Sequence, residues 1–249
     1  LTTQTKENNS LFTKSDKYIR KYDKERLLEI VPSHKYNSDL IIHFKKAMSS
    51  NDIATQYLSY YHIIEYYFDT LYNKYIIEQM KRWMKDPQIS LDEDASILKL
   101  VDKAKKLKGK TSEDGQGNEF DALRLVLERY VDIEKLKLKL EKNYSKKSIK
   151  EIYGVNIEEP NIYEFYKEKS VDFLDNNLKI DFNNDDTAYR NIRNRIYKTR
   201  NSLVHSKDNY TFKTYNPYDD ERDLKKEIPL IKIIAMEIII NTSEEIENM

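Results

Sequence analysis

The sequence contains no cysteine. Disulfide frameworks, cysteine-ligated metal sites and thiolate nucleophiles are therefore excluded, and the cytosol is the expected compartment. Glycine occurs only 4 times, and the one G-x-G string, Gly115-Gln116-Gly117, has no third glycine at the required spacing. Neither a dinucleotide-binding fingerprint nor a P-loop can form, so nucleotide enzymes of those types are excluded.

An excess of charge of one sign is also missing, because Lys+Arg and Asp+Glu both total 43. Any charge specialisation must be local. The longest apolar stretch, residues 228–240, is interrupted by Lys232 and Glu237 and is shorter than the ~20 residues of a membrane span. We find no signal peptide and expect no membrane partner. The first residue is Leu1 rather than Met, which indicates a processed product or a piece of a longer protein.

Few turn-forming residues and many Ile, Leu, Lys and Glu predict an all-α protein. We expect an N-terminal helical extension over residues 1–50 and a helical domain over residues 51–249. Breakers and capping residues predict helices over residues 16–30, 37–48, 52–86, 91–107, 119–143, 160–176 and 185–206, and a last helix that begins near Pro229.

The predicted helix over residues 185–206 has two distinct faces. An apolar stripe, typical of a helix packed on a core, contains Ala188, Ile192, Ile196, Thr199 and Leu203. The opposite face is polar and carries Arg190, Asn194, Tyr197, Asn201 and His205, with Arg193 and Arg200 at its flank. Several groups that carry or can carry positive charge therefore share one surface.

The C-terminal end of this helix reads Arg200-Asn201-Ser202-Leu203-Val204-His205, an R-N-x-x-x-H string. It resembles the signature of the HEPN superfamily, whose members are four-helix-bundle ribonucleases. The aromatic run from Tyr60 to Phe68 is similar to the first core helix of the antiphage, ApeA-like branch. The resemblance covers residues 57–85 and 160–245, and it leaves the N-terminal segment and a central helical insertion, residues 87–155, unmatched.

This resemblance implies metal-independent cleavage of single-stranded or loop RNA, with no cofactor, by a homodimer whose two motifs line one cleft. It also implies a toxin or effector of antiphage defence, with an antitoxin or an upstream sensor domain as a further partner. Arg200, Asn201 and His205 are the expected catalytic residues. Arg190, Asn194, Tyr197 and Lys207 are the expected RNA contacts.

The chemistry fits these side chains. RNA can be cleaved by attack of its own 2′-OH on the adjacent phosphate, which requires proton transfer and stabilisation of charge on phosphoryl oxygens. His205 titrates near neutrality, and the negative end of the helix dipole favours its charged form. Arg200 offers a planar fork of donors for a phosphate, and Asn201, one helical turn before His205, can hold the imidazole or contact RNA.

Glu65 falls within the apolar stripe of the helix predicted over residues 52–86, and a buried carboxylate needs a partner. Two partners are equally plausible: a motif arginine, Arg193 or Arg200, or a core Tyr hydroxyl. His62, at the edge of the stripe, is expected to be a packed histidine and not a catalytic one. The histidines show no H-x-x-x-H or H-E-x-x-H spacing, so we expect no metal site.

Two functions remain open at this stage. The first is the endoribonuclease. The alternative is a non-catalytic helical module of the same fold that serves dimerisation or regulation, in which the R-N-x-x-x-H string would be a helix-capping coincidence. An inert module has no need of Arg190, Arg193, Arg200, Asn201 and His205 together, which favours the enzyme.

Overall fold

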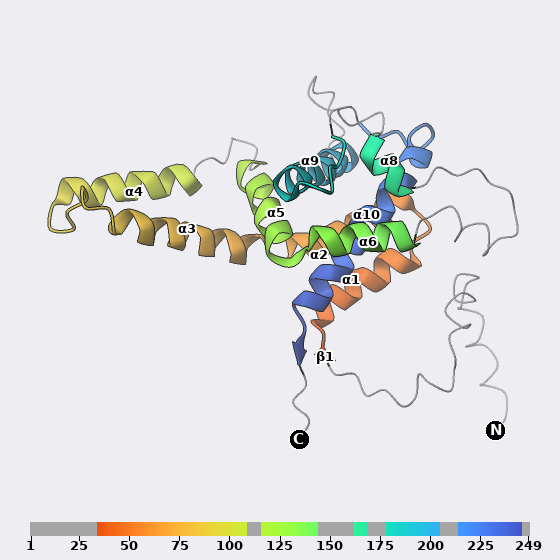
Figure 1. Cartoon of the computed structure of the whole chain (residues 1–249), viewed down its shortest axis with the longest axis horizontal. Helices are drawn as coiled ribbons and strands as arrows, with labels where there is room; N and C mark the ends of the chain where they lie inside the picture. The colour runs from red at the N-terminus through yellow and green to blue at the C-terminus, as the bar shows by residue number, and fades with distance from the viewer. Residues whose placement is uncertain (1–33, 109–115, 144–161, 169–177, 205–213, 246–249) are drawn as a thin grey trace, which may run out of the picture. The chain divides into compact units, whose positions relative to one another are not determined.

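A computed structural model of the chain describes residues 34–108, 116–143, 162–168, 178–204 and 214–245. The chain forms two compact units, residues 36–243 and a terminal unit of residues 1–35 with 244–249. In the terminal unit, β1 (His34–Lys35) pairs antiparallel with β2 (Glu244–Glu245). The larger unit is helical (Figure 1), as predicted, and its elements are α1 (Ser38–Ser49), α2 (Ile53–Glu65), α3 (Phe68–Met84), α4 (Asp94–Lys108), α5 (Gln116–Tyr130), α6 (Ile133–Asn143), α8 (Ile162–Glu168), α9 (Asp185–Val204) and α10 (Glu221–Asn241).

The core of this unit lies among α2, α5, α9 and α10. α2 packs along α10, α5 packs along α9, and α2 also contacts α5 and α9. α1 covers α2, and α6 covers α10. The buried side chains include Tyr57, Ile64, Leu123, Leu127, Ile192, Ile196, Ile234 and Ile238.

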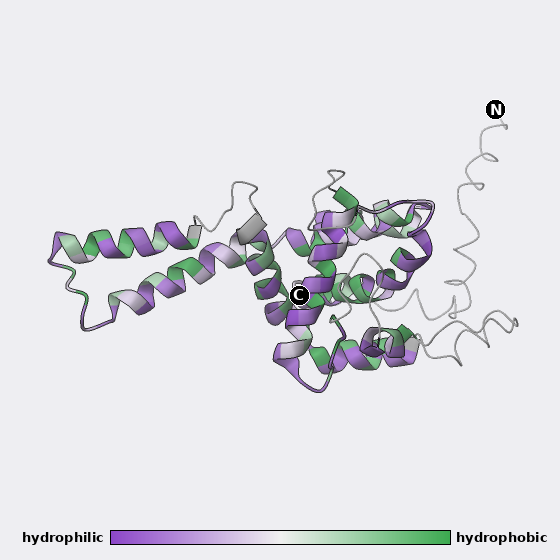
Figure 2. Cartoon of the chain, turned by 90° about the horizontal axis from the view of Figure 1, so that it is seen from above, coloured by the Kyte–Doolittle hydropathy of each residue, from purple (hydrophilic) through white to green (hydrophobic). Residues whose placement is uncertain are grey.

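The expected boundaries at residues 50 and 87–155 do not separate independent packing units. The division at residue 50 falls between α1 and α2, which pack on each other. α5 and α6 lie within the expected insertion, yet Leu127 of α5 and Leu136 of α6 are fully buried in the common core. α4 is the first helix of the same segment and lies beside α3, which precedes the segment. Both helices carry hydrophobic and hydrophilic residues along their length (Figure 2).

The continuous helix predicted over residues 52–86 is wrong, because the chain breaks at Tyr66 and Tyr67. The Tyr67 amide donates to the carbonyl of Ile64, three residues back, at 3.4 Å. Its ring packs against Tyr66 and Tyr130, each with centroids 5.1 Å apart. No glycine or proline marks the break, and this aromatic packing accounts for it. As a result, α2 packs on α1 and α10, while α3 packs on α5 and α4.

The single helix predicted over residues 119–143 is also two helices. α5 ends at Tyr130, and Asp132 begins α6 by accepting the amide of Lys135 at 3.0 Å. The Tyr189 hydroxyl of α9 donates to the Val131 carbonyl at 2.6 Å and satisfies the backbone at this turn. The break redirects the chain so that α5 contacts α9 and α6 contacts α10.

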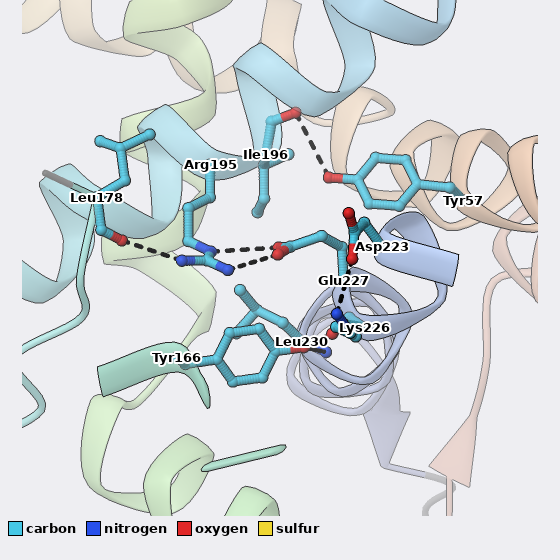
Figure 3. A network of polar contacts seen from close by, with 9 residues as sticks. All are labelled: Tyr57, Tyr166, Leu178, Arg195, Ile196, Asp223, Lys226, Glu227 and Leu230. Carbon is cyan, nitrogen blue, oxygen red and sulfur yellow. Dashed lines mark hydrogen bonds and ion pairs between the residues drawn. The ribbon is translucent and has the colours of Figure 1, made fainter. Parts of the chain in front are cut away.

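The last helix begins at Glu221 and not near Pro229, which lies inside it. A proline inside a helix disturbs the backbone hydrogen bonds of the surrounding turn. Here the Tyr166 hydroxyl from α8 lies within the helical turn, where it donates to the Lys226 carbonyl at 2.5 Å and accepts the Leu230 amide at 3.1 Å (Figure 3). This bridge links two backbone groups on either side of Pro229, and α10 continues past the proline.

The remaining predicted helices agree in position where the structure describes them. α1 and α4 match residues 37–48 and 91–107 within three residues at each end, and α8 lies within residues 160–176. α9 begins where the capping residues predict, since Asn184 accepts the Thr187 amide at 3.0 Å. The helix predicted over residues 16–30 lies outside the described residues. No helix in the described ranges combines the length and apolarity needed to cross a bilayer.

Candidate functional site

The candidate site lies at the C-terminal end of α9. Asn201 lies in the last turn of α9, which ends at Val204, and Arg200 directly precedes that turn. His205 is the next residue in the sequence, and both His205 and Lys207 lie outside the described residues. The description of the site therefore rests on the arginine, the asparagine and the side chains that hold them.

Two neighbours hold the Arg200 guanidinium. Its Nη1 donates to Asn201 Oδ1 at 3.0 Å, and its Nη2 lies 3.2 Å from Glu119 Oε1 in α5. The side chain is 18% exposed. A guanidinium carries five N–H donors, so these two contacts leave donors for a further anion. Arg200 is thus held in one orientation, and its described partners do not use all of its donors.

Glu119 is a residue of the candidate site that sequence reasoning missed. The same oxygen, Oε1, also accepts the Tyr61 hydroxyl of α2 at 2.5 Å. Burial raises the pKa of Tyr61, and the bond to Glu119 raises it further, so the phenol stays a proton donor. Three helices therefore meet at one carboxylate, which lies in the first turn of α5. In sequence, Glu119 reads as an ordinary charge at a helix N-terminus.

Asn201 is 1% exposed and Tyr197 is 8% exposed, so both are buried. The Tyr197 ring packs against Phe120 of α5 with centroids 4.9 Å apart. Burial raises the pKa of Tyr197, and the Asn201 side chain opposes this shift by hydrogen bonding. Tyr197 and Asn201 therefore form the buried side of the site, and Asn201 holds the Arg200 guanidinium through its Oδ1.

The expected open polar face of α9 is therefore wrong in its C-terminal half. Arg190 is exposed and Asn194 is partly buried, as RNA contacts would require, whereas Tyr197 and Asn201 are covered. The cause is α5, which packs along this part of α9. The apolar stripe is confirmed, since Ala188, Ile192, Ile196 and Thr199 are buried and Leu203 packs against the core.

Glu65 does not meet either motif arginine or a core tyrosine. Its side chain is 38% exposed, and Oε2 lies 2.9 Å from Nδ1 of His62, which is itself 45% exposed. The break after α2 explains the error, because the apolar stripe does not continue through Tyr66. His62 is accordingly not the packed histidine we expected, although its ring lies 5.3 Å from that of His43.

Sequence reasoning also missed Arg195 of α9, whose side chain is completely buried. Arg195 Nε donates to Glu227 Oε2 at 3.2 Å, its Nη2 pairs with Oε1 of the same carboxylate, and Nη1 donates to the Leu178 carbonyl at 3.1 Å (Figure 3). The rings of Phe165 and Tyr166 lie 5.4 and 5.1 Å from its guanidinium carbon. Arg195 thereby ties α9 to α10 and α8.

Among the described residues, no group of three or more His, Asp or Glu side chains has the arrangement of a metal site. The C-terminal end of α9 offers a fixed guanidinium, and His205, a side chain that can carry a proton, follows α9 in the sequence. A guanidinium can bind an anionic oxygen, and a histidine can transfer a proton.

No curated protein and no solved structure matches the chain. Residues 41–240 match the protein family described as methylamine utilization protein MauJ. This segment includes all of α2, α5 and α9, the three helices that supply Tyr61, Glu119 and Arg200. Since the match extends over most of the 249 residues, the chain belongs to the MauJ family.

Proposed function

We propose that this protein is a metal-independent endoribonuclease of the HEPN type that cleaves single-stranded or loop RNA through the RNA's own 2′-OH. The observation that carries the proposal is the pairing of Arg200 near the end of a core helix. Glu119 and Asn201 orient its guanidinium, and these described partners leave some of its N–H donors for a phosphate. The family's description refers to methylamine utilization; the side chains at the end of α9 are what support RNA cleavage.

In this reaction the 2′-oxygen attacks the adjacent phosphorus, and the bond to the 5′-oxygen of the next nucleotide breaks. The products are a 2′,3′-cyclic phosphate and a 5′-hydroxyl. Arg200 binds a non-bridging phosphate oxygen and stabilises the charge that grows there in the transition state. His205 carries the proton, either from the 2′-OH or to the leaving oxygen.

Glu119 acts through Arg200. Its carboxylate is fixed by the Tyr61 hydroxyl and in turn fixes one corner of the guanidinium. A donor that is already oriented needs no reorganisation when charge develops on the phosphate. Glu119 and Tyr61 are therefore positioning residues, and Arg200 is a catalytic residue.

The resemblance to HEPN enzymes extends the proposal to a homodimer that lines one cleft with two motifs, and to a toxin or effector in antiphage defence. Light scattering combined with an RNase assay tests the shared cleft. We expect a dimer at micromolar concentration. A monomer with full activity would contradict the shared-cleft arrangement.

The alternative is a helical dimerisation or regulatory module of the same fold without activity. The partial exposure of Arg200 and the exposure of Arg190 favour the enzyme, since a purely structural arginine gains stability from complete pairing, as Arg195 does.

The deciding experiment incubates the purified chain with RNA in the presence of EDTA. We expect cleavage to persist and the products to carry 2′,3′-cyclic phosphate and 5′-hydroxyl ends. The His205→Ala variant should lose turnover by a factor on the order of 10²–10⁴, while the matched control His62→Ala, which changes an exposed histidine outside the site, should cleave normally. Full activity in His205→Ala would favour the non-catalytic module instead.

A further inference from the structure

A second guanidinium faces α5 on the same side of α9 as Arg200. Arg193 precedes Arg200 by two helical turns, which corresponds to about 10 Å along the helix axis. Its guanidinium carbon lies 3.8 Å from the ring centroid of Phe120, and Phe120 is the residue next to Glu119. Consecutive residues of α5 therefore hold the two arginines, one through an aromatic face and one through a carboxylate.

Arg193 is incompletely paired. Its Nε is buried and has no hydrogen-bond partner in the described part of the chain. Its contact with a carboxylate, between Nη1 and Asp121 Oδ1, spans 3.9 Å, and Asp121 is itself 50% exposed. Burial lowers the pKa of Arg193, and the nearby Arg124 and Arg190 also lower it, against Asp121 and Glu128. The guanidinium stays charged, so the folded protein holds a poorly neutralised cation here.

Nearby arginines show what full pairing looks like. Arg124 on α5 donates to Glu128 at 2.6 Å and to Asp186 at 2.7 Å, and Arg195 is bound on three sides. A guanidinium that lies over an aromatic ring and whose nearest carboxylate contact spans 3.9 Å is suited to receive a further anion.

We propose that Arg193, stacked on Phe120, is a second phosphate-binding subsite, which holds a backbone phosphate of the same RNA strand whose scissile phosphate lies at Arg200. This subsite rests on the proposed function. The two residues are about 10 Å apart along the axis of α9, which is more than the width of one phosphate group, so in this proposal each contacts a different phosphate. Exposed Arg190, one turn before Arg193, extends the cationic track along α9.

The subsite gives the RNA strand a defined path. A single phosphate contact at Arg200 leaves the strand free to pivot, whereas two contacts along α9 fix its direction relative to His205. Backbone contacts of this kind position the nucleic acid and carry no base information. Arg193 should therefore affect affinity for all RNA sequences equally.

The test measures binding of a single-stranded oligoribonucleotide by fluorescence anisotropy over a range of salt concentrations, in the His205→Ala background so that the RNA stays intact. Each phosphate contact contributes about 0.7 to the slope of log affinity against log salt concentration for a single strand. We expect Arg193→Gln to lower the slope by about this amount and to raise Kd roughly tenfold, an amount typical of a lost contact to a charged group. Arg193→Lys should keep the slope and recover part of the affinity.

Arg124→Gln is the matched control, because it removes a charge from a neighbouring arginine that is already paired; we expect its salt slope to be unchanged. In the cleaving protein, Arg193→Gln should raise KM and leave kcat within about twofold, as expected for loss of ground-state binding. Thermal unfolding verifies that each variant folds.

Asp121→Asn provides a variant that leaves Arg193 in place and changes an exposed position. Removing this carboxylate should strengthen RNA binding severalfold, whereas Glu134→Gln, on α6 and outside the groups that act on Arg193, should not. An unchanged salt slope and KM in folded Arg193→Gln, while the unaltered chain cleaves RNA, would overturn the subsite and leave the nuclease intact. Absence of both cleavage and binding by the unaltered chain would overturn the proposed function itself.

Discussion

Arg195 and Arg200 lie on the same helix and each contacts a glutamate from another helix, yet their surroundings differ. Arg195 and Glu227 have side chains that are 0% and 2% exposed, and the guanidinium is bound by two carboxylate oxygens and a backbone carbonyl. Arg200 and Glu119 are 18% and 16% exposed, and their contact joins one nitrogen to one oxygen. The same pair of residue types thus makes a closed structural link in one place and an open, oriented cation in the other.

The difference shows what to look for in a binding arginine. Complete pairing marks an arginine whose loss breaks the fold, because a buried charge without a partner is strongly destabilising. Partial pairing with residual exposure marks an arginine that can still bind a ligand. Arg193 belongs to the second group.

Among variants of the two arginine pairs, Arg200→Ala should have the largest effect on function. Removing a donor that stabilises charge in the transition state lowers catalytic efficiency by about 10²–10³-fold, and the loss of a phosphate contact weakens RNA binding as well. Arg200→Lys should restore only part of the activity, since a point charge does not reproduce the planar fork. Unfolding by urea should change little for either variant. Normal kcat/KM in Arg200→Ala would contradict the proposal that this arginine binds the scissile phosphate.

The largest effect on stability should come from Arg195→Met. It leaves the Glu227 carboxylate buried and unpaired, which costs about 3–5 kcal/mol in the free energy of unfolding. The double variant Arg195→Met with Glu227→Leu should regain most of that stability, because no charge is left buried. Urea denaturation measures both. A loss that persists in the double variant would mean that packing, and not the charge, is responsible.

Glu119→Gln tests whether the Arg200–Glu119 pair has only a structural role, as the Arg195–Glu227 pair does. The amide keeps an acceptor for the Tyr61 hydroxyl but gives up the charge that orients Arg200. We expect kcat to fall on the order of tenfold, which corresponds to about 1.4 kcal/mol, with a small change in stability. Single-turnover cleavage at saturating RNA measures kcat, and Glu128→Gln on the same helix serves as the control. A large loss of stability with normal kcat would instead make Glu119 structural.

Tyr166→Phe should lower the free energy of unfolding less than the loss of Arg195 does. The ring beside Arg195 remains, but the hydroxyl that bridges Lys226 and Leu230 in α10 is lost. Leaving buried backbone groups unsatisfied costs about 1–3 kcal/mol. Thermal unfolding should report the loss, and a Pro229→Ala change in the same variant should recover part of it because α10 can then relax into a regular helix. RNA cleavage should be unaffected at temperatures where the variant is folded.

The smallest effect should come from His43, which lies outside both arginine pairs. Burial lowers its pKa below the ordinary value of 6.5, and His62 and Lys46 lower it further against Asp39 and Glu65. The unfolded chain therefore binds the proton more readily, so stability is complete above pH 6.5 and declines as the pH falls from 6.5 to the lower pKa of the folded state. His43→Gln should remove this decline in urea titrations, while the pH profile of RNA cleavage, which should depend on His205, stays unchanged.

Periodicity and capping residues predicted α9, its apolar stripe and its start at Asn184, because these are local properties of the chain. They did not predict the break at Tyr66 and Tyr67, where packing of the Tyr67 ring against Tyr66 and Tyr130 takes the place of a breaker residue. They also placed the start of α10 too late, since the tolerance of Pro229 depends on a hydroxyl that is distant in the sequence.

The same distinction applies to the site. The motif residues Arg200 and Asn201 are adjacent and could be proposed from sequence. Their partner Glu119 could not, because it comes from a segment that appeared to be an insertion and because pairing across 81 residues leaves no periodic signal. Glu65 was the wrong carboxylate for the converse reason: its position in an assumed continuous helix suggested burial that the bend after α2 removes.

The junction of Tyr61, Glu119 and Arg200 has a consequence for synthesis of the chain on the ribosome. Its three members emerge in order, from α2, α5 and α9, and the arginine emerges last. A nascent chain that ends before residue 200 can assemble the carboxylate and the phenol but has no guanidinium for them to orient. If the protein cuts RNA, translation therefore completes most of the fold before any cutting activity exists, and the ribosome's own RNA is spared until Arg200 has been added.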